Sequence, residues 1–184
     1  MTAIASRSQL RMSFLRYALV TVPAVLLLGM ISGAASNSGY ENRWFAALRQ
    51  PEFMPPGWAF PVAWTILYVL LGVVLAMILH ARGARGRGLL IGLFLLQMLL
   101  NYSWSPLFFA AHEVTAALAV IIAMIVFTIV LMAMLRRVRV VAAALLVPYL
   151  AWLCFAAARN WRIMDLNPNA SELVPQAGRT NISL

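Results

Sequence analysis

Five long stretches of this chain contain no Asp, Glu, Lys or Arg, and they constrain its fold more than any other feature. A helix rises about 1.5 Å per residue, so about 20 apolar residues cross the hydrocarbon core of a bilayer. The uncharged stretches are long enough to do so, and they cover residues 17–40, 53–81, 88–111, 114–135 and 140–158. The sequence therefore predicts an all-α, polytopic membrane protein built as a bundle of five transmembrane helices.

The predicted helices and their connections use nearly all of the 184 residues, which leaves no room for a soluble catalytic domain. We expect one transmembrane domain over 17–164, with helices at about 17–36, 60–80, 88–110, 114–135 and 140–162. A basic leader over 1–16 should be disordered or lie on the membrane surface, and 165–184 should form a loose polar tail.

Arginine is distributed unevenly between the two ends of the predicted helices. All 14 basic residues are Arg, and nine of them form three clusters: Arg7, Arg11 and Arg16; Arg82, Arg85 and Arg87; Arg136, Arg137 and Arg139. This asymmetry is a topology signal rather than a nucleic-acid-binding surface, despite the formal charge of +9. It predicts a cytoplasmic N-terminus and an exported C-terminus in a bacterial inner membrane.

The first helix has a second interpretation. Its arginines, its apolar run and the small residues Gly33-Ala34-Ala35 are also typical of a cleaved secretory signal peptide. The uncharged run is longer than most signal sequences, and Pro23 suits a packed membrane helix. We expect a retained helix, and the intact mass of the protein distinguishes the two.

Aromatic and amide side chains recur at helical spacing on three of the predicted helices. Amides are costly to expose to lipid, so we expect Gln97 and Asn101 to point into the bundle. They could bond across helices and hold the bundle together, or line a ligand pocket with the neighbouring rings. The residues on these stripes are Trp64 and Tyr68; Gln97, Asn101, Trp104 and Phe108; and Trp152, Phe155, Ala156 and Arg159.

Such a pocket would have large flat walls, a few hydrogen-bonding groups and little charge. It would suit a tetrapyrrole or a sterol better than an ion or a sugar. The sequence shows no acidic proton relay, no paired carboxylates and no glycine-rich phosphate loop. His80 and His112 have no carboxylate or thiol partner at ligand spacing, so no metal site is expected.

The connection over 37–59 is too apolar for a free loop. Trp44, Phe45 and Leu48 follow helical spacing, which predicts a short amphipathic helix at 42–49. These aromatic residues could belong to a belt at the membrane interface, or the connection could be a lid over a site between the helices.

The same residues resemble the TspO/MBR family, which comprises the tryptophan-rich sensory proteins and the translocator proteins, or peripheral-type benzodiazepine receptors. The family's loop pattern W-Y-x-x-L-x-K-P-x-W-x-P-P aligns with Trp44–Pro56, and its W-x-x-x-Y with Trp64 and Tyr68. Its pattern Q-x-x-x-N-x-x-W-S-P-x-F-F aligns with Gln97–Phe109. The last helix matches over Pro148–Trp152, Phe155-Ala156, Asn160 and Leu166-Asn167.

The resemblance implies a five-helix bundle, usually a homodimer, that acts in tetrapyrrole transport, storage or sensing. Its ligands are porphyrins such as protoporphyrin IX, haem and, in some members, cholesterol; no cofactor is expected. Matched position by position, the family's ligand pocket falls on Phe45, Pro55, Trp64, Tyr68, Asn101, Trp104, Phe108, Trp152 and Ala156.

Two other functions stay open. In some bacterial members, tryptophans that match Trp64 and Trp152 are linked to light-dependent porphyrin breakdown, so these two are candidate catalytic residues. The chain could also be a membrane interaction or regulatory subunit. Some family members lie in outer membranes, so that location stays open as well.

The chain departs from the family pattern at several positions. Phe45, Gln50 and Phe53 replace a Tyr, a Lys and a Trp of the loop, and the changes at Trp161 and Asp165 weaken the case for sterol binding. Arg159 replaces a Leu. Its side chain could snorkel to the membrane interface, or pair with Glu52 or with a ligand carboxylate.

A dimer interface is expected on the third helix. Gly88 and Gly92 are four residues apart, which permits close approach of a second helix. Gly29 and Gly33 on the first helix have the same spacing, so the glycines alone do not select the interface. The family precedent favours the third helix.

Overall fold

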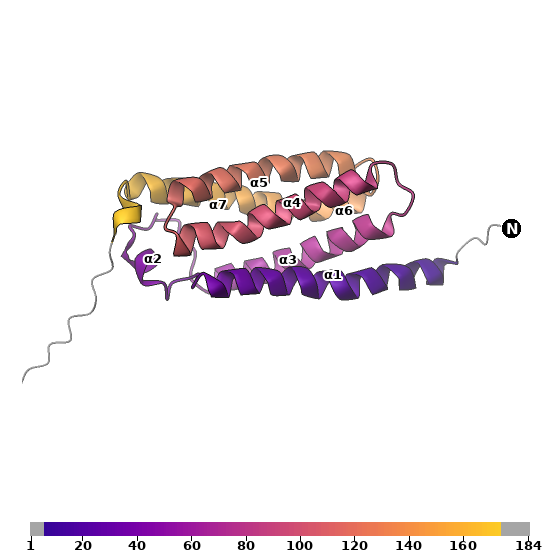
Figure 1. Cartoon of the computed structure of the whole chain (residues 1–184), viewed down its shortest axis with the longest axis horizontal. Coiled ribbons are helices and arrows are strands. Elements are labelled where there is room, and N and C mark those ends of the chain that lie inside the picture. Colours follow the sequence, from indigo (N-terminus) through magenta and orange to yellow (C-terminus); the bar gives the residue numbers. More distant parts are fainter. Residues whose placement is uncertain (1–5, 174–184) are drawn as a thin grey trace, which may run out of the picture.

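A computed structural model of the chain describes residues 6–173. Its five membrane-length helical segments lie side by side along one axis (Figure 1). All five are long and apolar enough to cross a membrane, as predicted. The helical elements are α1 (Arg7–Ala35), α2 (Arg43–Ala47), α3 (Ala59–His80), α4 (Arg87–Ser105), the π-helical turn η1 (Pro106–Ala110), α5 (Val114–Leu135), α6 (Val140–Leu145), α7 (Val147–Leu166) and the 3-10 turn η2 (Ala170–Glu172).

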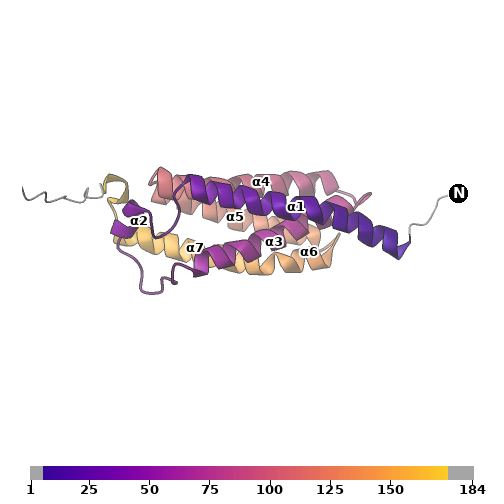
Figure 2. The same ribbon diagram turned by 90° about the horizontal axis from the view of Figure 1, so that it is seen from below.

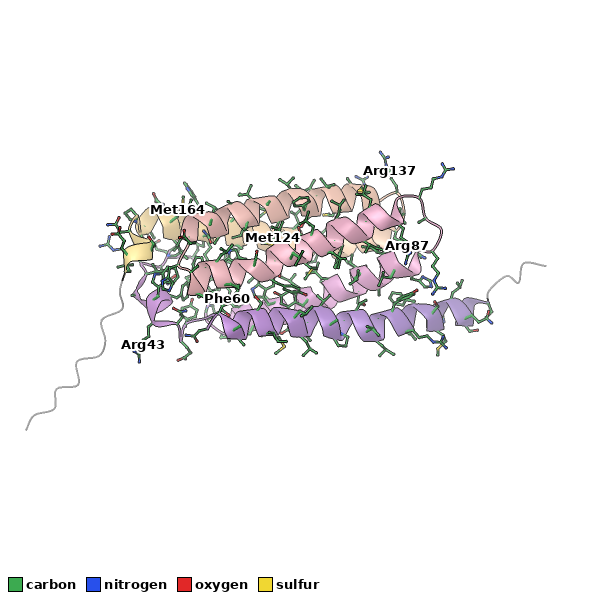
Figure 3. All side chains as sticks on the ribbon, viewed as in Figure 1. Arg43, Phe60, Arg87, Met124, Arg137 and Met164 are labelled. Atoms are coloured by element: carbon green, nitrogen blue, oxygen red, sulfur yellow. The ribbon has the colours of Figure 1, made fainter. Side chains whose placement is uncertain are left out.

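Successive long helices are antiparallel, and all but α1 and α3 are joined by short turns, so the bundle has two distinct ends. Helix α1 packs mainly on α3, α4 on α5, and α5 on α7. The loop end carries α2 and the C-terminal end of α7, while α6 and the α3–α4 turn lie at the other end (Figures 1 and 2). Figure 3 places Arg87 and Arg137 together at that second end, the arginine end, and Arg43 at the loop end.

Helix α1 begins ten residues before the predicted start at 17. Ser6 and Gln9 form a capping box, in which each side chain accepts a hydrogen bond from the other residue's backbone N–H. Pro23 is the one proline inside the helix, so nothing breaks the first turns. The expected disorder of the leader is therefore wrong for residues 7–16, and residues 1–5 lie outside the described part of the chain.

Prolines account for the irregular ends of two spans. The third span changes from α4 to the π-helical η1 at Pro106. The last span, predicted as one helix over 140–162, is divided at Leu146, because Pro148 has no N–H to donate to the preceding turn. It also continues to Leu166. The helix predicted over 114–135 is confirmed as α5.

The backbones of α1 and α3 come close together at Gly72. The Thr21 hydroxyl donates a hydrogen bond of 2.8 Å to the Gly72 carbonyl oxygen. A Cβ atom at Gly72 would lie against the backbone Cα of Val22. Glycine therefore permits a helix contact that any side chain would push apart.

Candidate functional site

A cavity of about 480 Å³ lies between the helices toward the loop end. Its wall is contributed by α1, α3, α4, α5, α7 and the connection between α1 and α3. Nine aromatic residues line it: Tyr40, Phe45, Phe60, Trp64, Tyr68, Trp104, Phe109, Trp152 and Phe155. Phe60 near the loop end and Met124 in the middle of the bundle, two of the lining residues, are labelled in Figure 3.

The rings of two predicted site residues, Trp64 and Trp152, meet inside this wall. Their centroids are 6.3 Å apart with an interplanar angle of 80°, an edge-to-face arrangement. Trp64 also stacks on Tyr68 at 5.1 Å, and Trp152 contacts Phe155 at 5.4 Å. These contacts hold the indole rings in fixed orientations around the cavity.

The structure brings most of the predicted site residues to this cavity. Phe45, Trp64, Tyr68, Asn101, Trp104, Trp152 and Ala156 line it, and so does Arg159. Three predicted residues lie elsewhere. Phe108 is buried behind Trp104, with the rings stacked at 5.1 Å. Pro55 accepts a hydrogen bond from the Tyr40 hydroxyl through its carbonyl oxygen. Gln97 is buried deeper in the bundle.

A chain of buried hydrogen bonds connects the cavity wall to the interior. The Tyr68 hydroxyl donates to Asn101 Oδ1 at 2.9 Å, and Asn101 Nδ2 donates to the Tyr149 hydroxyl at 2.9 Å. Gln97 Nε2 donates to the same hydroxyl at 2.9 Å and to Thr128 Oγ1 at 3.1 Å. The chain therefore joins α3, α4, α5 and α7. Both amides hold helices together, and Asn101 also faces the cavity.

Arg159 is the charged residue in the cavity wall. Its side chain is 4% exposed, which contradicts the alternative that it snorkels to the membrane interface. The guanidinium carbon lies 4.9 Å from the ring centroid of Phe60 and 5.6 Å from that of Trp104. Among residues 6–173, the ion pair is Arg162–Asp165, so neither Glu52 nor another described carboxylate pairs with Arg159.

The connection between α1 and α3 is a packed cover of the cavity. Helix α2 spans Arg43–Ala47, close to the predicted 42–49, and Asn42 caps it by accepting a hydrogen bond from the Phe45 N–H. Trp44 and Phe45 are buried in this cover, whereas Phe53 and Trp58 of the same connection are exposed, as residues of an interfacial belt would be. Asn42 Nδ2 donates to the Phe109 carbonyl oxygen at 3.2 Å, which fastens the cover to η1.

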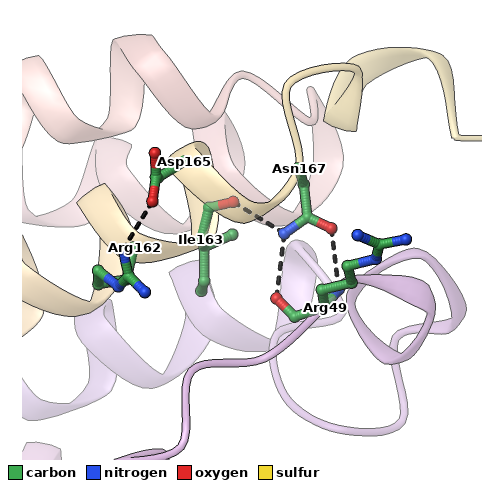
Figure 4. Close-up of polar contacts among 5 residues, drawn as sticks. All are labelled: Arg49, Arg162, Ile163, Asp165 and Asn167. Carbon is green, nitrogen blue, oxygen red and sulfur yellow. Dashed lines mark hydrogen bonds and ion pairs between the residues drawn. The ribbon is translucent and has the colours of Figure 1, made fainter.

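The start of the predicted tail holds this cover from the other side. Asn167 accepts a hydrogen bond from the Arg49 N–H at 2.8 Å and donates one to the Arg49 carbonyl oxygen at 3.0 Å (Figure 4). Trp44 Nε1 donates to the Ala170 carbonyl oxygen at 2.7 Å. The expectation of a loose tail from 165 is therefore wrong through Ala170, and residues 174–184 lie outside the described part.

Sequence reasoning did not identify several residues that shape the site. Tyr40 and Phe60 line the cavity, and Tyr149 and Thr128 hold the amides in place. Tyr149 had a usable signal: it lies in the matched segment Pro148–Trp152. The other three would have required knowledge of which helix faces which.

Comparison with known proteins agrees with this architecture. A family model described as the TspO/MBR family matches residues 20–166. The chain belongs to the TspO/MBR family. It is an integral, multi-pass membrane protein of that family, with five helices able to cross the bilayer.

Relatives of this TspO/MBR protein occur in bacteria, archaea and mammals. The Tryptophan-rich protein TspO of Chlorobaculum tepidum is 38% identical over 127 residues, which cover 68% of this chain and 80% of the relative. The protein of the same name in Archaeoglobus fulgidus is 37% identical over 150 residues, 80% of this chain and 94% of the relative. The Translocator protein of Bos taurus is 34% identical over 142 residues, covering 76% and 84% of the two chains.

Proposed function

We propose that this TspO/MBR protein binds a porphyrin-type tetrapyrrole, such as protoporphyrin IX or haem, in the aromatic cavity. The observation that carries the proposal is the convergence of Trp64, Asn101 and Trp152, from three helices, on one cavity of about 480 Å³. Small-molecule sites typically have volumes of about 300–1,000 Å³, apolar walls and a few placed polar groups. A flat aromatic macrocycle suits indole walls with a single amide contact.

The roles of the lining residues follow from their positions. Trp64 and Trp152 offer ring faces and edges to a macrocycle, and Trp104 adds a third indole from α4. Asn101 is already held by Tyr68 and Tyr149, so its position is preorganised before a ligand enters. The connection over 37–58 would shield one end of the ligand from water, because Tyr40, Phe45 and Gly57 line the cavity there. The physiological role would be transport, storage or sensing of the ligand.

Titration of the detergent-solubilised protein with protoporphyrin IX and haem tests this proposal. Binding should quench tryptophan fluorescence, and Trp152→Ala should weaken it by about tenfold, which corresponds to roughly 1.4 kcal/mol. Aromatic contacts contribute roughly 0.5–1.5 kcal/mol beyond the area they bury. Asn101→Ala should also weaken binding. Trp161→Ala is the control, because Trp161 lies on the same helix but is 55% exposed and outside the cavity wall. Equal affinities for Trp152→Ala and Trp161→Ala would contradict the proposed site.

The contact between Trp64 and Trp152 favours a second candidate function, porphyrin breakdown in light with dioxygen as the oxidant. Two indoles 6.3 Å apart in the wall would both contact a bound macrocycle. Illumination of the aerobic complex should then bleach the porphyrin spectrum, and Trp152→Phe should abolish the bleaching while binding in the dark persists. If the wild-type spectrum is stable under light, porphyrin breakdown is contradicted and binding is the function that remains.

We further propose a homodimer through α4. Gly88 and Gly92 are exposed, and a Cβ atom at either would meet no other atom within 4 Å among the described residues. Leu95, Leu96 and Leu99 continue the same exposed helix face. A stripe of this kind permits close approach of a second helix within the bilayer.

The proposed orientation has the N-terminus in the cytoplasm of a bacterial inner membrane. The start of α1 and the turns that carry Arg82–Arg87 and Arg136–Arg139 belong to the same end of the bundle (Figures 1 and 3). Arginine-rich turns are retained on the cytoplasmic side.

A further inference from the structure

Arg159 is a buried cation for which the described part of the chain supplies no anion. Its Nε atom is fully buried and has no hydrogen-bond partner among residues 6–173. The ion pair found in that range, Arg162–Asp165, lies farther along α7. A buried charge is costly unless it is paired and hydrogen-bonded. The structure therefore holds an unsatisfied group in the cavity wall.

The surrounding rings compensate this charge only in part. Phe60, Trp104 and Phe108 have ring centroids 4.9, 5.6 and 5.8 Å from the guanidinium carbon. Such cation–π contacts contribute roughly 0.5–2 kcal/mol each. They leave the buried Nε without an acceptor among residues 6–173, because ring faces do not replace a planar oxygen pair. The complement of a guanidinium fork is a carboxylate, which accepts two parallel hydrogen bonds.

We propose that Arg159 receives a carboxylate of the ligand, so that the cavity selects flat, apolar molecules that carry an acid group. This inference rests on the proposed function, because it assigns a ligand class to the same cavity. It does not follow from the family resemblance, since the matching family residue is a leucine. The resident ligand would then be an acidic tetrapyrrole rather than a sterol or a neutral macrocycle.

The position of Arg159 also sets the orientation of the ligand. Arg159 lies almost two turns beyond Trp152 on α7, nearer to the loop end, whereas Tyr68 and Asn101 belong to the polar chain that leads into the bundle. An acid group at Arg159 therefore lies beneath the cover that contains Tyr40 and Phe45, both of which line the cavity. The apolar ring system lies toward Trp64 and Trp152.

A comparison of a porphyrin acid with its ester tests the inference. Protoporphyrin IX and its dimethyl ester are titrated against the full-length protein in one neutral detergent, with tryptophan quenching as the readout. We expect the wild type to bind the acid at least tenfold more tightly than the ester. Arg159→Leu should bind the two probes equally. Arg162→Leu is the matched control, since it removes a partly exposed arginine of the same helix and should keep the wild-type preference.

The possible outcomes separate the inference from the proposed function. Equal affinity of the wild type for acid and ester, or a preference that survives in Arg159→Leu, would overturn the role of Arg159 and leave the cavity as a porphyrin site. Binding of neither probe by the wild type would overturn the proposed function, and the inference with it. Retained ester binding by Arg159→Leu shows that this variant is folded.

Discussion

Replacing Gly72 by alanine is expected to destabilise the bundle by about 1–3 kcal/mol, the usual cost of overpacking a filled interior. The added Cβ would press on the Cα of Val22 and lie 3.1 Å from the Thr21 carbonyl oxygen. Both neighbours are backbone atoms, so no side-chain rotation relieves the contact. The two helices would have to separate, which would also strain the hydrogen bond from Thr21 to Gly72.

Thermal unfolding in detergent, at a protein concentration at which the chain is monomeric, measures this effect, with Gly92→Ala as the control. The monomer is used because Gly92 lies on the helix face proposed for the dimer. Both substitutions replace glycine by alanine inside a long helix, so both gain about 1 kcal/mol of helix propensity. Their difference isolates the contact, because a Cβ at Gly92 meets no described atom within 4 Å. Equal melting temperatures for the two variants would show that α1 and α3 do not depend on close approach at Gly72.

The second large effect has the opposite sign: Arg159→Leu should stabilise the ligand-free protein by about 1–3 kcal/mol. The wild type holds a guanidinium that is 4% exposed and has no carboxylate partner in the described chain. Replacing buried charges by apolar residues of similar volume is often stabilising by about 1–4 kcal/mol. Loss of the contacts with Phe60 and Trp104 offsets part of this gain.

The melting temperature of the ligand-free Arg159→Leu variant checks the sign. Arg162→Leu is the control, because Arg162 is partly exposed and its ion pair with Asp165 should contribute only about 0–1 kcal/mol. A lower melting temperature for Arg159→Leu would mean that the rings hold the cation at no net cost. In that case Arg159 would be a structural residue of the α7 packing.

The fold was predictable because membrane helices must be long, apolar and uncharged. The helices predicted at about 60–80 and 114–135 lie within about one residue of α3 and α5. The sequence also placed Trp64, Asn101 and Trp152 on stripes expected to face inward, because amides are costly to expose to lipid and the rings recur on the polar-containing stripes. These three residues do surround one cavity.

The remaining features depend on contacts between distant segments. Helical spacing puts Gln97, Asn101, Trp104 and Phe108 on one stripe, but it does not tell which of them reaches a cavity and which packs on a neighbour. Gln97 turns to Thr128 and Tyr149, and Phe108 supports Trp104 from behind. The direction of Arg159 likewise depends on the rings packed around it.

The cover of the cavity depends on two segments that are more than 100 residues apart in sequence. Asn167 is hydrogen-bonded to Arg49, and Trp44 donates a hydrogen bond to Ala170. A chain shortened before Asn167 would keep every residue of the cavity wall and still lose the hydrogen bonds that hold the cover in place. The C-terminal boundary chosen for expression, or a tag attached close to the end of α7, should therefore change the rates at which a ligand binds and dissociates.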